Sequence, residues 1–261
     1  MTDSHCHLAG EEFAADLPDV VGRAKAAGVG RALVILALDD AAELARADTV
    51  RVAWPECRFA VGVHPHNAKA VAHELDSFAD RLLGLVETTR DIRAIGEIGL
   101  DYHYDFSPRE LQHEVFRRQL EVAASINIPV VIHTREAEED TLRIIEQVRD
   151  RMGVLRGVFH CFTGDAAAAV RALATGFLVS IPGVATFPKA ESLRQAVAGL
   201  PDDRMLVETD SPYLAPIPYR GKRNEPAYVA KVVERLAAVR GVSAASIAEA
   251  TDRNFDRLFQ P

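Results

Sequence analysis

The sequence predicts an α/β protein with a single domain, residues 1–261, folded as a (β/α)8 or TIM barrel. Short runs rich in β-branched residues alternate from end to end with longer segments rich in Ala, Glu, Arg and Leu. No Gly/Ser-rich linker divides the chain. Its length of 261 residues suits a barrel, which typically needs about 250 residues. An open, doubly wound sheet is the alternative.

Each expected strand has an apolar centre. The strands are expected at residues 1–6, 31–38, 58–64, 93–98, 128–134, 156–161, 176–181 and 204–209. The helices between and after them are expected at residues 16–28, 41–54, 72–90, 108–127, 137–152, 165–175, 188–198, 227–240 and 243–259. Pro108 suits a first helical turn, and Gly28 and Gly176 suit positions where a helix stops before the next strand.

Composition describes an ordinary globular protein, with 48% hydrophobic and 26% charged residues. The 30 Lys and Arg residues against 38 Asp and Glu residues leave a net charge of −8, so any nucleic-acid site must be local. No apolar run is long enough to span a membrane, and no signal peptide is expected because Asp3, His5 and His7 interrupt the first residues. Three cysteines without CxxC spacing favour a reducing compartment, the cytoplasm.

Histidines gather where the predicted strands end. A lone histidine at such a place is more often a hydrogen-bonded core residue. Here seven of the nine lie at or just past strand ends, namely His5, His7, His64, His66, His103, His133 and His160. In a parallel barrel these ends meet at one mouth, where so many imidazoles without partners would leave donors and acceptors unsatisfied.

A divalent metal site explains this pattern, because imidazole nitrogens and carboxylate oxygens are ligands that such ions take. Five or six ligands exceed the four of a closed zinc site, so we expect two ions that share a carboxylate, with Glu97 as the bridge. Strand alternation turns Cys6 and Cys161 away from the mouth. Glu208 could bind the metal, orient a metal ligand, or serve as a buried ion-pair partner. We favour the second role, in which it orients a metal ligand.

These residues resemble the TatD-type metal-dependent deoxyribonucleases, a family within the amidohydrolase-like barrels. The resemblance runs from end to end and is carried by seven segments. They are Asp3-Ser4-His5-Cys6-His7-Leu8, Gly62-Val63-His64-Pro65-His66, Gly96-Glu97-Ile98-Gly99-Leu100-Asp101-Tyr102, Ile132-His133-Thr134-Arg135, His160-Cys161-Phe162-Thr163-Gly164, Glu208-Thr209-Asp210-Ser211-Pro212-Tyr213 and Gly221-Lys222-Arg223-Asn224-Glu225-Pro226.

The resemblance implies a barrel with two divalent ions, Mg, Mn or Zn. His5, His7 and Asp210 would hold the first ion, His133 and His160 the second, and Glu97 would bridge them. It also implies hydrolysis of DNA from a 3′ end, in repair or DNA breakdown. We further predict a preference for single strands. We expect a hydroxide held between the ions to attack the phosphodiester. Asp210 would then accept or orient its proton, and His64 would steady a phosphate oxygen or the leaving group.

Substrate contacts are expected on the loops around the mouth. The basic segment 216–226 contains Arg220, Lys222 and Arg223, and its Asn224 belongs to the same matching segment. Arg135 follows the fifth strand. An aromatic segment follows the fourth strand and comprises Tyr102, His103, Tyr104 and Phe106. We expect it either to stack on bases of the substrate or to pack as a lid over the barrel.

Two other functions compete with a nuclease. The same fold and metals could hydrolyse C–N or ester bonds, including the aminoacyl ester of a tRNA, although Arg135, Lys222 and Arg223 favour a phosphate. Alternatively, the metals only stabilise the barrel, but six ligands shared by two ions leave positions open for substrate. Metal identity and oligomeric state are not encoded in any pattern we find.

Overall fold

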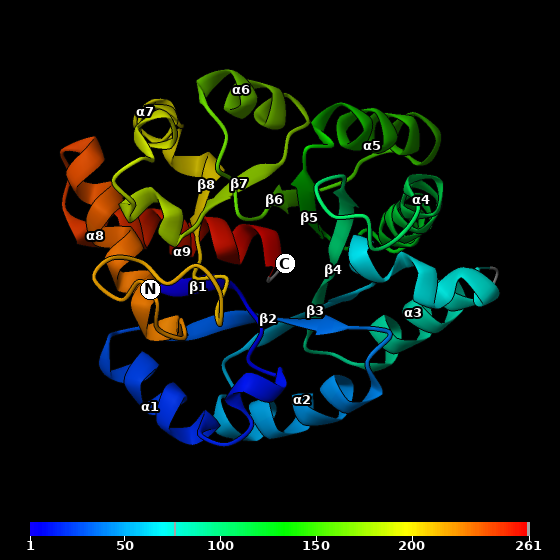
Figure 1. Ribbon diagram of the computed structural model, residues 1–261, viewed down its shortest axis with the longest axis horizontal. Helices are drawn as coiled ribbons and strands as arrows, with labels where there is room; N and C mark the ends of the chain where they lie inside the picture. Colours follow the sequence, from blue (N-terminus) through cyan, green and yellow to red (C-terminus); the bar gives the residue numbers. More distant parts are fainter. Residues whose placement is uncertain (76, 260–261) are drawn as a thin grey trace.

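Eight parallel strands pair in chain order in the computed structural model, which describes residues 1–75 and 77–259 (Figure 1). The strands are β1 Thr2–Cys6, β2 Arg31–Ala37, β3 Arg58–Gly62, β4 Ile92–Asp101, β5 Val130–Arg135, β6 Gly157–Phe159, β7 Leu178–Ile181 and β8 Met205–Val207. Each lies within the region expected from the sequence or overlaps it.

The first and last strands close the sheet into a barrel. The backbone N–H of Asp210 donates to the carbonyl of His5 at 3.0 Å, just beyond β8. Deeper in the barrel, the hydroxyl of Thr209 donates to Asp3 Oδ2 at 2.6 Å and its N–H donates to Asp3 Oδ1 at 2.9 Å. These contacts confirm the predicted barrel and exclude the open sheet.

Helices surround the strands (Figure 1). They are α1 Leu17–Ala26, α2 Ala41–Ala53, α3 Phe78–Thr88, α4 Arg109–Ser125, α5 Glu138–Met152, α6 Ala166–Ala174, α7 Glu191–Gly199, α8 Val229–Arg240 and α9 Ala244–Phe259. None of the helices that the structure describes is both long and apolar enough to cross a bilayer.

The helix expected at residues 72–90 is wrong at its start. The chain instead forms a 3-10 helix, η2 Pro65–Glu74, and α3 begins only at Phe78. Ser77 stands at the N-cap of α3, a position that serine favours, and Phe78, Leu82 and Val86 form the buried face that begins after it.

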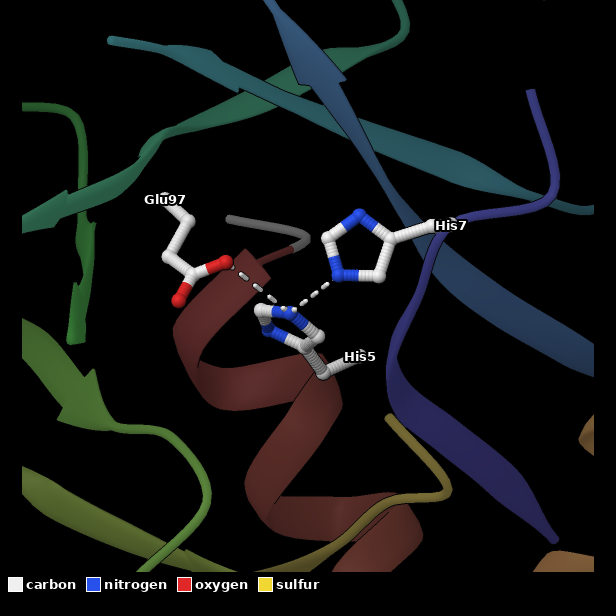
Figure 2. A group of neighbouring side chains, drawn as sticks. All are labelled: His5, His7 and Glu97. Atoms are coloured by element: carbon white, nitrogen blue, oxygen red, sulfur yellow. Dashed lines mark hydrogen bonds and ion pairs between the residues drawn. The ribbon is translucent and has the colours of Figure 1, made fainter. Parts of the chain in front are cut away.

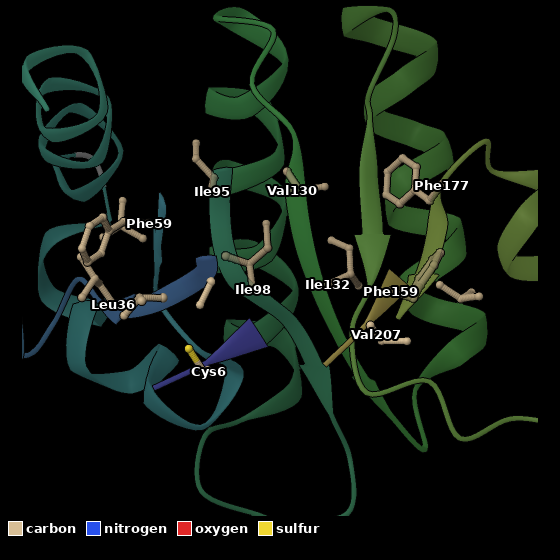
Figure 3. Packing of buried hydrophobic residues seen from close by; sticks show 14 of the residues in the cluster. Cys6, Leu36, Phe59, Ile95, Ile98, Val130, Ile132, Phe159, Phe177 and Val207 are labelled. Atoms are coloured by element: carbon tan, nitrogen blue, oxygen red, sulfur yellow. The ribbon is translucent and has the colours of Figure 1, made fainter. Parts of the chain in front are cut away.

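Apolar side chains fill the barrel and a second layer around it. Inside, alternate residues of seven strands meet α9, whose Phe255, Leu258 and Phe259 join the same cluster. Outside, residues that face the helices, such as Ile95, Ile98 and Ile132, belong to the buried cluster between strands and helices (Figure 3). Because the interior is packed, polar strand-end groups collect above it.

Candidate metal centre

Glu97 stands at the centre of a group of imidazoles at the carboxyl end of the barrel. Its Oε1 atom lies 2.7 Å from His160 Nε2, 2.8 Å from His133 Nδ1 and 3.4 Å from His64 Nε2. Its Oε2 atom lies 3.5 Å from His5 Nε2. Four strand ends that are distant in sequence therefore converge on one carboxylate.

His5, His7 and Asp210 form the side of this group nearest β1. Figure 2 shows His5, His7 and Glu97 directed toward one another. The Nε2 atoms of His5 and His7 are 3.3 Å apart, and Asp210 Oδ1 lies 3.7 Å from the first and 3.5 Å from the second. Asp210 has a φ of +58°, uncommon for a residue other than glycine, which fits a side chain held in place by its surroundings.

An extra residue in β4 directs Glu97 into the barrel. The pairing of β4 with β5 shifts between Ile95 and Ile98, which face Val130 and Ile132, so three residue steps on β4 match two on β5. Both isoleucines lie in the outer apolar layer. With strict alternation, only one residue, facing inward, would separate these two outward-facing isoleucines. Here two residues, Gly96 and Glu97, lie between them.

Strand β1 contains the same irregularity. Asp3 pairs with Ala32 and Cys6 pairs with Val34, so β1 also has one residue more than β2 over this stretch. After it, Cys6 lies in the outer apolar layer with its Sγ 3.6 Å from the carbonyl of Leu33. His5 and His7, on either side of Cys6, both reach the mouth.

Two glycines allow β4 to approach β5 closely. A Cβ atom at Gly96 would lie 2.5 Å from Cβ of Val131, and one at Gly99 would overlap the carbonyl of His133. Gly99 also has a φ of +148°. These glycines therefore make room for the backbone that carries His133, rather than for a ligand beside Glu97.

Asp101 orients the ring of His133. Its Oδ2 atom lies 3.0 Å from His133 Nε2 and 2.8 Å from His66 Nε2, while its Oδ1 atom accepts the backbone N–H groups of His103 and Tyr104. With Nε2 engaged by Asp101, Nδ1 of His133 is the nitrogen that faces Glu97. Our sequence analysis missed this role, although Asp101 follows Glu97 by four residues and alternation beyond the extra residue gives both the same face.

Glu208 lies behind His160. Its Oε1 atom accepts the N–H of Cys161 at 2.6 Å and lies 3.4 Å from His160 Nδ1, on the side of the ring opposite Nε2, which faces Glu97. Among the described residues, Oε2 of Glu208 has no hydrogen-bond partner. Nδ1 of His160 likewise has no hydrogen-bond partner among these residues, so the contact is an ion pair and the orienting role of Glu208 stays a prediction.

His64 differs from the other imidazoles in its hydrogen bonding. Its Nδ1 atom accepts the backbone N–H of His66 at 3.1 Å, so the proton of the neutral ring is on Nε2. Burial lowers the pKa of His64 to about 4, although Glu97 opposes this shift, so the ring is neutral near pH 7. Nε2 of His64 is therefore a hydrogen-bond donor that points into the site.

Buried carboxylates dominate the electrostatics of the mouth. Burial on its own would raise the pKa of Glu97, but the imidazoles of His160, His64 and His133 hold that pKa well below its usual value. Burial likewise opposes ionisation of Asp210, but the imidazoles of His7, His160 and His5 together outweigh it, so its pKa is lowered too. Both groups are ionised, with only imidazoles beside them as balancing charge.

This donor set fits a divalent cation. Buried charges in proteins are paired or coordinate metals, and imidazole nitrogen with carboxylate oxygen suits several divalent ions. One group with ligand atoms within 4.8 Å of one another is His5, His7 and Glu97, another is His64, Glu97 and His133, and a third is His5, His160 and Glu208. His, Glu and Asp side chains are thus placed to bind metal here.

The expected substrate contacts divide into exposed and engaged side chains. Arg135 and Lys222 are exposed. Arg223 instead donates to both oxygens of Asp16, at 2.9 and 2.7 Å, and to the carbonyl of Glu12.

Asn224 and Tyr102 face away from solvent at the mouth. Asn224 is fully buried and donates to the carbonyls of Thr209 and Tyr213. The hydroxyl of Tyr102 donates to Asp140 at 2.6 Å, toward α5. Polar groups of Arg223, Asn224 and Tyr102 thus have partners within the protein, and their role as substrate contacts stays a prediction.

The barrel and the cluster of imidazoles and carboxylates at its mouth are typical of metal-dependent hydrolases. The chain matches the family described as TatD related DNase over residues 2–260, and it belongs to that family. This finding confirms the resemblance seen in the sequence.

Individual relatives are similar to this protein over nearly its whole length. A Bacillus subtilis protein named uncharacterized metal-dependent hydrolase YabD is 38% identical over 260 residues, covering 99% of this chain and 98% of its own. A protein of Escherichia fergusonii named 3′-5′ ssDNA/RNA exonuclease TatD is 34% identical over 264 residues, with 99% and 98% covered. The crystal structure of YJJV, a TatD homologue from Escherichia coli, has a TM-score of 0.89 at 28% identity, with 100% and 98% covered.

Proposed function

We propose that this protein is a divalent-metal-dependent deoxyribonuclease that removes nucleotides from the 3′ end of single-stranded DNA. The observation that carries the proposal is the Glu97 carboxylate, which has four imidazoles within 3.5 Å at an open barrel mouth. The relative named 3′-5′ ssDNA/RNA exonuclease supports both the substrate class and the direction of digestion.

Two ions would be held as the resemblance implies. His5, His7 and Asp210 would bind one, His133 and His160 the other, and Glu97 would bridge them. We assign Nδ1 of His133 and Nε2 of His160 to the metal, since their other nitrogens lie 3.0 Å from Asp101 and 3.4 Å from Glu208.

Bound ions would lower the pKa of water and offset negative charge on the phosphodiester. Water adds to phosphorus, the P–O3′ bond breaks, and the shortened strand leaves with a 3′-hydroxyl. Asp210, ionised at the mouth, accepts the proton of the attacking water. His64 donates a hydrogen bond from its Nε2–H to a phosphate oxygen or to the leaving O3′, because its Nδ1 accepts the N–H of His66, and the leaving oxygen takes its proton from water.

The test is digestion of defined oligonucleotides after chelation and addition of single metals. We expect hydrolysis with at least one of Mg, Mn and Zn, and sequential shortening of single strands labelled at the 5′ end. With a 3′ label, release of the labelled mononucleotide comes first. Uniform internal nicking would contradict an exonuclease.

A same-fold hydrolase of C–N or ester bonds is the main competitor. A panel containing a lactone, an aminoacyl-tRNA and an oligonucleotide separates the two, since preference for either of the first would overturn the nuclease. If no substrate were hydrolysed while chelation lowered the melting temperature, the metals would be structural only. The predicted roles in DNA repair or breakdown and the cytoplasmic location remain predictions.

A further inference from the structure

We propose that Tyr104 and Phe106 form a platform on which a base of the single-stranded substrate stacks, beside the phosphodiester bound at the metal centre. The inference rests on the proposed function and extends it by identifying residues that bind a base of the strand. It replaces Tyr102, whose ring the structure turns toward α4 and α5.

The two rings are stacked on each other and open to solvent. Their centroids are 5.2 Å apart and their planes differ by 14°. Tyr104 is 42% exposed and Phe106 is 50% exposed. Aromatic rings normally contribute to stability by burial, so a stacked pair that keeps about half of its surface in solvent contributes less in this way. Although His103 and Arg135 also pack against Tyr104, ring surface is left for a ligand.

One imidazole joins this pair to the metal centre. The ring of His66 lies nearly perpendicular to both, at 89° and 77°, with centroids 5.4 Å from Tyr104 and 4.9 Å from Phe106. The same ring lies 4.4 Å from that of His64, which reaches Glu97. A base on the platform therefore belongs to a nucleotide at or next to the phosphate under attack.

The loop that carries the rings is held at both ends. At its start, Asp101 Oδ1 accepts the N–H of His103 at 2.9 Å and that of Tyr104 at 3.1 Å. At its end, the hydroxyl of Ser107 donates to the carbonyl of His66 at 2.8 Å, and Gln112 donates to the carbonyl of Ser107. Such anchoring preorganises the platform, so less conformational entropy is lost when a base binds.

A cation beside the platform indicates a nucleotide rather than an apolar partner. The guanidinium of Arg135 lies 4.9 Å from the centroid of the Tyr104 ring. In the described part of the chain no carboxylate forms an ion pair with it, although the net charge is −8. Flat rings next to an unpaired guanidinium are the combination that single-strand binding proteins use for bases and phosphates.

The test compares Tyr104→Ala/Phe106→Ala with the ring-preserving control Tyr104→Phe/Phe106→Tyr. Each protein, loaded with Mn²⁺, is titrated with a fluorescent single strand whose phosphorothioate linkages resist hydrolysis. A matched strand carries abasic sugars at its three 3′-terminal positions. KM for an ordinary oligonucleotide is measured in parallel.

We expect the alanine variant to bind the ordinary strand about tenfold or more weakly and the control variant to match wild type. On the abasic strand, wild type and alanine variant should bind alike, because no base remains to stack. Equal weakening on both strands, or no weakening at all, would overturn the platform. Base-dependent binding without hydrolysis of any oligonucleotide would keep the platform and overturn the exonuclease.

Discussion

Oδ2 of Asp101 lies 3.0 Å from Nε2 of His133 and so turns Nδ1 of that ring toward Glu97. A carboxylate that fixes the orientation of an imidazole in this way also raises its basicity as a ligand. The same carboxylate anchors the loop that carries Tyr104. Asp101 thus supports the metal centre and the proposed base platform together.

Asp101→Asn should therefore weaken metal binding more than it slows the metal-loaded enzyme. Loss of such an outer partner typically costs about 10–100-fold in metal affinity or activity. We expect the Mn²⁺ concentration for half-maximal activity to rise by about that factor, as measured by metal titration after chelation. The neighbouring exposed Asp105→Asn is the control, and an unchanged metal requirement in Asp101→Asn would refute the role.

Glu97→Ala should remove metal and abolish hydrolysis, because this carboxylate touches both proposed ion sites. Metal content, measured by mass spectrometry after gel filtration, should fall toward zero, and the melting temperature should stop responding to added Mn²⁺. Glu97→Gln is the companion variant, since it keeps the size of the side chain. Retained nuclease activity in Glu97→Ala would exclude this arrangement.

His64→Ala and His133→Ala should differ in whether the variant protein keeps its metal. Nδ1 of His64 is engaged by a backbone N–H, so we expect His64→Ala to retain its metal while kcat falls about a hundredfold. His133→Ala should lose metal. If His64→Ala lost as much metal as His133→Ala, His64 would be a ligand and not a donor.

Arg135→Ala and Arg223→Ala should likewise separate substrate binding from structure. Arg135→Ala should raise KM for oligonucleotides and reduce the slope of log KM against log salt concentration by about one. Arg223→Ala should leave KM unchanged, because its guanidinium already pairs with Asp16. A raised KM in Arg223→Ala alone would reverse this assignment.

The Asp16–Arg223 pair should contribute a small, pH-dependent stability. The hydrogen bond from Arg223 holds the pKa of Asp16 below its usual value, so the contribution is present above about pH 4 and disappears as the pH falls through the lowered pKa. Because both side chains are about one-third exposed, we expect less than about 1 kcal/mol. Urea unfolding of Arg223→Ala and wild type at pH 7 and at low pH measures it; a larger loss at low pH would contradict the sign.

Closure of the barrel should depend on Thr209. Its hydroxyl donates to the fully buried Asp3, and removing one partner of a buried polar pair leaves the other desolvated and unsatisfied. Because burial raises the pKa of Asp3 to about 8, its carboxyl is neutral at pH 7, and Thr209→Val should cost about 1–3 kcal/mol in the free energy of unfolding. Thr163→Val is a control in the loop after β6, and equal stability of the two variants would show that this bond is not needed.

The order of the elements and the identity of the clustered histidines could be read from the sequence. Both depend on local patterns: apolar alternation, helix-ending glycines such as Gly28, and polar residues such as His133 that follow an apolar run. Since parallel strand ends must meet at one mouth, a local pattern was sufficient to predict a long-range cluster. The start of α3 was missed because the first residues of the expected helix belong to the end of η2, and α3 begins only after its N-cap residue Ser77.

Only the tertiary structure decided which way individual side chains point. The extra residue in β4 that turns Glu97 inward depends on pairing with β5, and the hydrogen bonds of the Arg223 guanidinium depend on Asp16, 207 residues earlier in the chain. Likewise, Tyr102 points toward α5 while Tyr104 faces solvent, although two residues of the same kind stand in one loop. Such choices depend on register and on partners distant in sequence, so no local spacing encodes them.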